Sequence, residues 1–64
     1  MGENLSLREL QVLRHIAAGL TYRSTARRLG ISVHTVDKYI RRIRAKNGVH
    51  TQAELIRLAL QLGL

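Results

Sequence analysis

Apolar residues recur at intervals of three and four positions along most of the chain, which is the spacing of one face of an α-helix. Proline is absent, and each apolar-periodic stretch is followed by a glycine, where helices commonly end. These glycines are Gly19, Gly30, Gly48 and Gly63. The pattern predicts an all-α, four-helix fold with helices at about residues 7–18, 22–29, 33–46 and 52–62. Because the 64 residues contain no linker or repeat, we expect a single domain over residues 1–64.

Each predicted helix starts after a polar residue whose side-chain oxygen can cap the helix N-terminus. These residues are Ser6, Thr21, Ser32 and Thr51. A glutamate follows both Ser6 and Thr51 three positions later, which is the spacing of a capping box. The start signals therefore agree with the glycine stops.

The second and third predicted helices are joined by the short segment Leu29-Gly30-Ile31-Ser32. A helix that ends at glycine, a turn with one apolar anchor and a new helix that opens after a serine together form the layout of a helix-turn-helix. Ala26 is small where the two helices must approach closely, and Val36 and Ile40 can bury the later helix against the earlier one. This pair of helices is therefore predicted to be the functional element.

Charge is unevenly distributed along the chain. Eleven Lys and Arg against four Asp and Glu give a formal charge of +7, which favours a polyanionic partner. The excess lies between Tyr22 and Lys46, where Asp37 is the single acid. Outside that segment the charges balance, with Arg8, Arg14 and Arg57 against Glu3, Glu9 and Glu54. An ordinary solvated helix mixes both signs, so this segment is predicted to contact nucleic acid.

The third predicted helix separates apolar from polar residues. Its apolar side, expected to be core, carries Val33, Val36, Ile40 and Ile43. The rest of the helix carries the residues expected to contact bases in the major groove, which are His34, Asp37, Lys38 and Arg41. Contacts with the DNA backbone are expected from Arg42 on the same helix and from Tyr22 and Arg23 at the start of the second helix. Tyr22 is explained equally well as a partly buried surface ring.

Asp37 is unusual on this face, because a carboxylate near phosphates weakens binding. It either pairs with Arg41 one turn later and aims that guanidinium, or accepts a hydrogen bond from N4 of cytosine. We favour the pairing with Arg41.

Several other functions are disfavoured by the composition. The chain has no cysteine, and its three histidines lack partners at helical spacing, so no metal or other cofactor is expected. An enzyme is not expected, because there are no paired carboxylates and little room for a cleft. No apolar run reaches the roughly 18 residues needed to span a bilayer, and no signal peptide is recognisable. We therefore expect a cytoplasmic protein without a membrane partner.

The last predicted helix is apolar over more than half of its circumference, which is more than one small core can bury. One explanation is a homodimer through Leu55, Leu58 and Leu62, which would read an inverted repeat in DNA. The other is a contact with a further domain of a longer chain, and both could hold in one protein.

Rival binding functions fit the pattern less well. The promoter-reading domain of a sigma factor shares the helix-turn-helix but not the apolar, glycine-ended last helix. A basic amphipathic membrane binder would be expected to form one continuous helix. RNA binding would favour an aromatic stacking platform, which the exposed face does not offer.

Three segments carry a resemblance to a known family: Leu5 to Leu13, Ala18 to Thr21 and Ala26 to Ser32. Together with Thr35-Val36, Lys46, Gly48-Val49 and Ala59 to Gly63, they resemble the DNA-binding domain of LuxR-type (GerE-like) bacterial transcription regulators. The resemblance covers nearly the whole chain. It implies a four-helix domain at the C-terminus of a longer regulator, behind a receiver or small-molecule-sensing domain, with dimerisation through the last helix.

At matching positions the resemblance implies base contacts from Asp37, Lys38 and Arg41 and backbone contacts near Arg23, Thr35 and Lys46. The chain departs from the family pattern at several positions. These are Asp37 for lysine, Ser24-Thr25 for Glu-Ile, Tyr39 for histidine and Asn47 for leucine. The departures imply an unusual preferred DNA sequence and a somewhat less stable domain.

Overall fold

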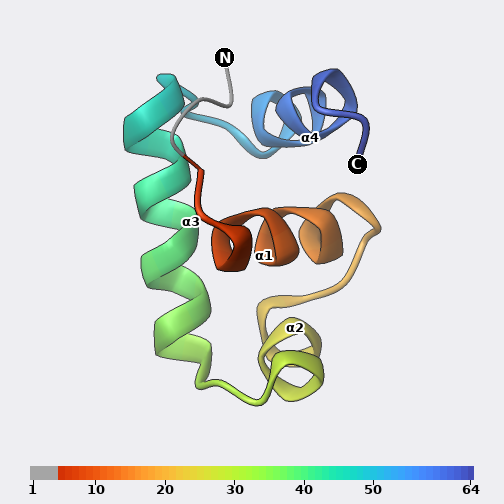
Figure 1. Ribbon diagram of the computed structural model, residues 1–64, viewed down its shortest axis with the longest axis vertical. Helices are drawn as coiled ribbons and strands as arrows, with labels where there is room; N and C mark the ends of the chain where they lie inside the picture. Colours follow the sequence, from red (N-terminus) through yellow and green to blue (C-terminus); the bar gives the residue numbers. More distant parts are fainter. Residues whose placement is uncertain (1–4) are drawn as a thin grey trace.

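In the computed structural model, which describes residues 5–64, the chain forms four α-helices joined by short loops (Figure 1). They are α1 (Leu7–Ala17), α2 (Tyr22–Leu29), α3 (Val33–Asn47) and α4 (Gln52–Gln61). Within these residues the prediction of an all-α, four-helix fold is confirmed, and helix ends differ from the predicted ones by at most one residue. Glu3, which we counted in a balanced flank, lies outside the described residues.

The predicted caps are present at the start of every helix. Oγ of Ser6 accepts from the N–H of Glu9 at 3.1 Å, and Oε1 of Glu9 accepts from the N–H of Ser6 at 2.9 Å, so both halves of the capping box are made. Thr51 and Glu54 form the same box on α4. Thr21 and Ser32 cap α2 and α3 with their side-chain oxygens. These bonds satisfy N–H groups that have no partner inside a helix.

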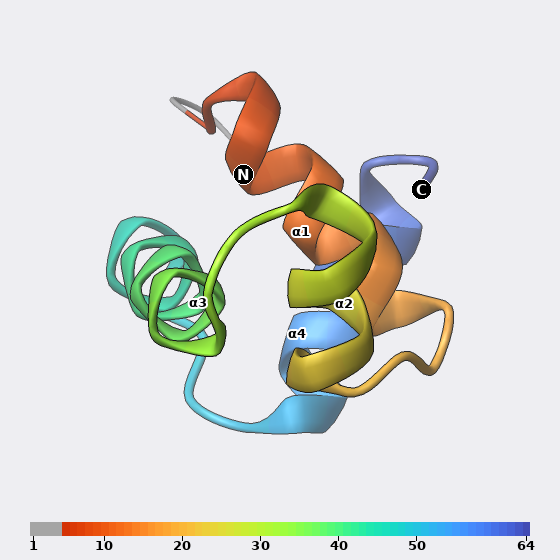
Figure 2. The ribbon, with the colours of Figure 1, turned by 90° about the horizontal axis from the view of Figure 1, so that it is seen from below.

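The helices are arranged around α1. It packs against each of the other three, and α2 also packs against α3. Figure 1 shows α3 along one side of the molecule with the other helices on its opposite side, and Figure 2 shows the same arrangement from below. One side of α3 is therefore left uncovered by the other helices.

The core gathers the apolar faces of all four helices. Its buried members are Val12, Leu13, Ile16, Ala26, Val36, Ile40, Ile43, Val49, Leu55, Leu58 and Ala59. Val33 was expected among them but is 45% exposed, because it begins α3 and the packing of the next turns does not reach it. None of the helices within residues 5–64 has the length and apolarity that a membrane crossing requires.

The division of the apolar residues of α4 between core and surface differs from our expectation. Leu55 and Leu58 are 0% and 5% exposed and belong to the core, and Leu62 is half-buried against it. Leu55 and Leu58 therefore leave almost no surface for a second copy of the chain. The apolar surface that α4 does expose lies at Ile56 and Leu60, which are 36% and 69% exposed.

Candidate nucleic-acid interface

The turn between α2 and α3 sets the direction of α3. Gly30 ends α2 with a φ of 69°, a left-handed conformation that glycine adopts without strain. The N–H of Ile31 donates to the carbonyl of Ala26 at 3.0 Å, and the Ile31 side chain packs against the core. Oγ of Ser32 then accepts from the N–H of Thr35 at 3.0 Å and opens α3. Local bonds and one apolar anchor thus hold the two helices in the layout of a helix-turn-helix.

The uncovered side of α3 collects the residues expected to contact bases. His34, Asp37, Lys38 and Arg41 line one shallow depression. His34, Lys38 and Arg41 are exposed, and Asp37 is half-buried. The structure therefore brings these four side chains together at the surface, within reach of a partner that covers α3.

Asp37 and Arg41 form an ion pair, so the favoured pairing is confirmed. Oδ2 of Asp37 lies 2.8 Å from Nε of Arg41, one helical turn away. The Arg41 side chain is 80% exposed. The ion pair uses its Nε, and its two terminal nitrogens add further hydrogen-bond donors to the exposed face. Basic and hydrogen-bonding groups on an exposed helix are suited to the acceptor-rich edges of bases.

Arg42 lies on the flank of this face and is exposed. The centre of its guanidinium is 5.9 Å from the centroid of the Tyr39 ring, within the range of a cation–π contact. Tyr39 is half-buried and packs against the core. The ring of Tyr39 therefore connects Arg42 to the hydrophobic core.

The remaining candidates for backbone contacts have different surroundings. Arg23 is exposed in the first turn of α2, and Tyr22 beside it is half-buried against the core. Thr35 is half-buried, and its Oγ1 lies 2.9 Å from Oγ of Ser32, so its hydroxyl already has a partner within the domain. Of these three, Arg23 has the side chain most accessible to a phosphate.

Lys46 and Glu9 form an ion pair that we did not predict. Nζ of Lys46 donates to Oε1 of Glu9 at 2.8 Å, and the Glu9 side chain is only 2% exposed. This pair joins the last turn of α3 to the first turn of α1, so the charge of Lys46, expected at the DNA backbone, is directed toward the protein. The sequence does contain a signal for the burial of Glu9, because Glu9 falls on the same helix face as Val12, Leu13 and Ile16.

The pKa of Glu9 reflects this environment. Burial acts to raise it and is the largest single influence, whereas the hydrogen bonds from Lys46 and from the Ser6 N–H lower it. The positive charges of Lys46 and Arg42 act in the same direction. The pKa of Glu9 is therefore lowered from its ordinary 4.5, and the carboxylate is ionised at neutral pH.

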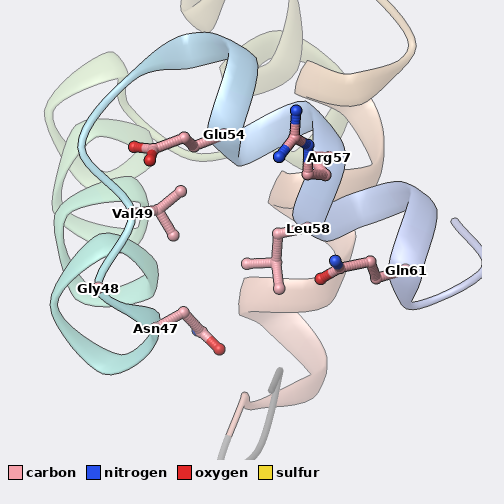
Figure 3. A pocket seen from close by; sticks show the side chains of 7 residues that line it. All are labelled: Asn47, Gly48, Val49, Glu54, Arg57, Leu58 and Gln61. Carbon is pink, nitrogen blue, oxygen red and sulfur yellow. The ribbon is translucent and has the colours of Figure 1, made fainter.

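A second hollow lies away from the four side chains of the exposed α3 face, between the end of α3 and α4 (Figure 3). Val49 and Leu58 provide apolar lining, and Asn47 stands at its edge with Nδ2 donating to the carbonyl of Ile43 at 3.1 Å. The carboxylate of Glu54 accepts from the N–H groups of His50 and Thr51 at 2.7 and 3.0 Å. The polar groups of Asn47 and Glu54 thus bond to the ends of α3 and α4, and Arg57 and Gln61 complete the lining of the hollow.

In the part of the chain that the structure describes, no group of three or more His, Cys, Asp or Glu side chains is arranged to hold a metal ion. The three histidines lie on α1, on α3 and in the loop before α4.

Comparison with known proteins identifies the family to which the chain belongs. Residues 3–59 match the model of the bacterial regulatory proteins of the luxR family. The response regulator Rre1 of Synechocystis sp. is 42% identical over 57 residues, covering 89% of this chain and 25% of the relative. The transcriptional activator RamA of Corynebacterium glutamicum is 41% identical over 59 residues, covering 92% of this chain and 21% of the relative.

The transcriptional regulatory protein FixJ of Bradyrhizobium diazoefficiens is 36% identical over 61 residues, covering 95% of this chain and 30% of the relative. The chain thus spans about a quarter of the length of these relatives. No solved structure matches it significantly. The match to the family extends from before α1 into α4 and includes the complete helix-turn-helix. The chain therefore belongs to the luxR family of bacterial regulatory proteins and is a DNA-binding domain of transcription regulators, not an enzyme.

Proposed function

We propose that the chain recognises a specific sequence in double-stranded DNA by placing α3 in the major groove. The observation that carries the proposal is the uncovered side of α3, where His34, Lys38 and Arg41 surround one depression. A helix fits the width of the major groove, and Lys and Arg can donate to O6 and N7 of guanine. His34 adds a ring nitrogen near the start of α3, where helices of this kind approach the bases most closely.

Contacts with phosphates would orient α3 in the groove. Arg23 on α2 and Arg42 on α3 are exposed and are the strongest candidates, with Tyr22 next to Arg23. Thr35 and Lys46 are weaker candidates, because their polar groups already bond to Ser32 and Glu9. The positive charge of Lys46 still adds to the long-range attraction of phosphates from its place in the ion pair.

Self-association through α4 is the second part of the proposal. Ile56 and Leu60 lie one turn apart on the exposed side of α4, and Leu64, which is 36% exposed, follows after another turn's length of chain. A two-fold dimer formed there would read an inverted repeat with half-sites about one turn of DNA apart. The buried Leu55 and Leu58 would support this surface from inside the domain.

The full-length protein is proposed to carry further parts. Because the chain spans about a quarter of its relatives, one of which is named a response regulator, we propose an N-terminal receiver or sensing domain. The exposed apolar side of α4 could also be the surface that such a domain covers. Since the proposed ligand is bacterial DNA, the site of action would be the nucleoid in the cytoplasm.

Selection of duplexes from a random pool tests the proposal directly. We expect enrichment of one sequence, and loss of about 1–3 kcal/mol of binding free energy for that sequence when Arg41→Ala is compared with the native chain. Arg14→Ala is the matched control, because Arg14 is exposed in the last turn of α1, which points away from α3 (Figure 1). The control should change affinity slightly and equally for all sequences.

Two results would contradict the proposal. If no sequence is enriched and all duplexes bind with the same salt-sensitive affinity, the basic face only attracts phosphates. If Arg14→Ala and Arg41→Ala weaken binding of the selected duplex equally, α3 is not the element that reads it.

A further inference from the structure

Asp37 is the only acidic residue on α3, and it lies among the cations of the exposed face. Its carboxylate shares one depression with His34, Lys38 and Arg41. A carboxylate on a surface that faces phosphates repels them and lowers affinity for every duplex. The presence of Asp37 therefore calls for an explanation other than general attraction to DNA.

The geometry of the pair with Arg41 supplies one. Oδ2 of Asp37 lies 2.8 Å from Nε of Arg41, the guanidinium nitrogen nearest to the side-chain stem. The guanidinium is planar and carries its other N–H donors on the two terminal nitrogens. With Nε bonded to Asp37, these terminal nitrogens form the outer edge, and that edge matches the O6 and N7 acceptors of guanine. The ion pair thus keeps the guanine-binding edge available and fixes its direction.

The pair is poorly explained by stability alone. The side chains of Asp37 and Arg41 are 38% and 80% exposed, so water screens their attraction and the pair adds little to the stability of the helix. Its larger effect is on the freedom of Arg41, a long side chain that loses conformational entropy when it binds a base. A side chain already held in its binding direction loses less, and it fits one arrangement of acceptors better than others.

We infer that Asp37 is a positioning residue that sets the preference of Arg41 for guanine without contacting a base itself. The inference rests on the proposed function of α3 in the major groove. On this face the carboxylate thus weakens binding to all duplexes and sharpens the choice at the base pair opposite Arg41.

Two variants that remove the same charge separate these effects. Asp37→Ala removes both the charge and the acceptor, whereas Asp37→Asn removes the charge and keeps an oxygen that can accept from Nε of Arg41. Each is used in duplex selection from a random pool, followed by affinity measurements at one salt concentration. Both should bind random duplexes more tightly than the native chain, by the same factor. Asp37→Ala should lower the preference for guanine about tenfold, and Asp37→Asn should retain most of it.

The Arg41→Ala background completes a double-mutant cycle. Comparison of the native chain with Arg41→Ala identifies the base position that depends on Arg41. In that background neither change at Asp37 should alter base preference, although both should still raise affinity for random duplexes. Thermal melts of all variants confirm that the affinities refer to folded protein.

Three outcomes overturn the inference. If Asp37→Ala leaves the preference for guanine unchanged, Asp37 affects DNA binding only through its negative charge. If Asp37→Ala, made in the Arg41→Ala background, removes a preference for cytosine, Asp37 contacts a base directly. If the native chain enriches no sequence, the proposed function has failed before any Asp37 variant is compared, and the inference fails with it.

Discussion

Nζ of Lys46 donates to Oε1 of Glu9 at 2.8 Å across 37 positions of sequence, and this pair ties the end of α3 to the start of α1. The same Oε1 accepts from the N–H of Ser6, so one oxygen serves both the cap of α1 and the contact with α3. Because the carboxylate is almost fully buried, its charge depends on these partners for compensation. The pair is therefore a structural connection between α3 and the helix at the centre of the fold.

Removing the cation should expose this dependence. We expect Lys46→Ala to lower the free energy of unfolding by about 2 kcal/mol, because it leaves a buried carboxylate without its charged donor. Chemical denaturation followed by circular dichroism measures the change. Lys38→Ala is the control, since Lys38 is an exposed lysine of the same helix, and it should change stability by less than about 0.5 kcal/mol. Equal effects of the two substitutions would show that the pair contributes nothing.

Acid should destabilise the domain through Glu9 and Glu54. Hydrogen bonds from the N–H groups of His50 and Thr51 lower the pKa of Glu54, and the pKa of Glu9 is also lowered, both from an ordinary value of 4.5. A group with a lower pKa in the folded chain stabilises the fold fully above its unfolded pKa and ceases to do so as the pH falls through its folded pKa. Stability should therefore begin to fall as the pH drops to about 4.5 and continue to fall below it.

Unfolding measured over a series of pH values checks this expectation in the native chain and in Glu9→Gln. The glutamine keeps an oxygen acceptor but cannot be protonated in this range, so the acid-induced loss should be smaller in the variant. A pH profile of the same depth in both proteins would exclude Glu9 as a source of the dependence.

A buried hydroxyl in α2 should cost the domain stability. Thr25 is 0% exposed, and its Oγ1 has no hydrogen-bond partner among the described residues. Thr25→Val replaces the hydroxyl with a methyl group of similar size, so we expect the free energy of unfolding to rise by about 1 kcal/mol. Thr35→Val is the matched control, because the Thr35 hydroxyl is bonded to Ser32, and it should bring no gain. Destabilisation by Thr25→Val would mean that the hydroxyl is satisfied in solution.

Polar substitution on the exposed side of α4 should weaken self-association. Leu60 is 69% exposed, and in the proposed dimer its burial would contribute to the interface, so Leu60→Gln should raise the dimer dissociation constant about tenfold. Leu7→Gln is the control, since Leu7 is 74% exposed on α1. Sedimentation and binding to an inverted repeat, compared with a single half-site, measure the effect. If both variants associate like the native chain, α4 is not the dimer surface.

The elements of this fold that could be predicted from sequence depend on neighbours along the chain. The caps at Ser6 and Ser32 join residues three positions apart, and the Asp37–Arg41 pair joins residues one turn apart. At such separations the helix itself brings the groups together, whatever packs around it. For the same reason the exposed face of α3 could be assigned by its periodicity before any contact was known.

The helices, their caps, the turn before α3 and the basic face all follow from the order of residues, because each depends on local geometry. Tertiary packing set the pairing of Glu9 with Lys46, since the two are brought together by the packing of α3 on α1. It also decided which side of α4 is core: a helix that is apolar over most of its circumference can turn either side inward. The packing of α1 against Leu55 and Leu58 fixed that choice and left Ile56 and Leu60 at the surface.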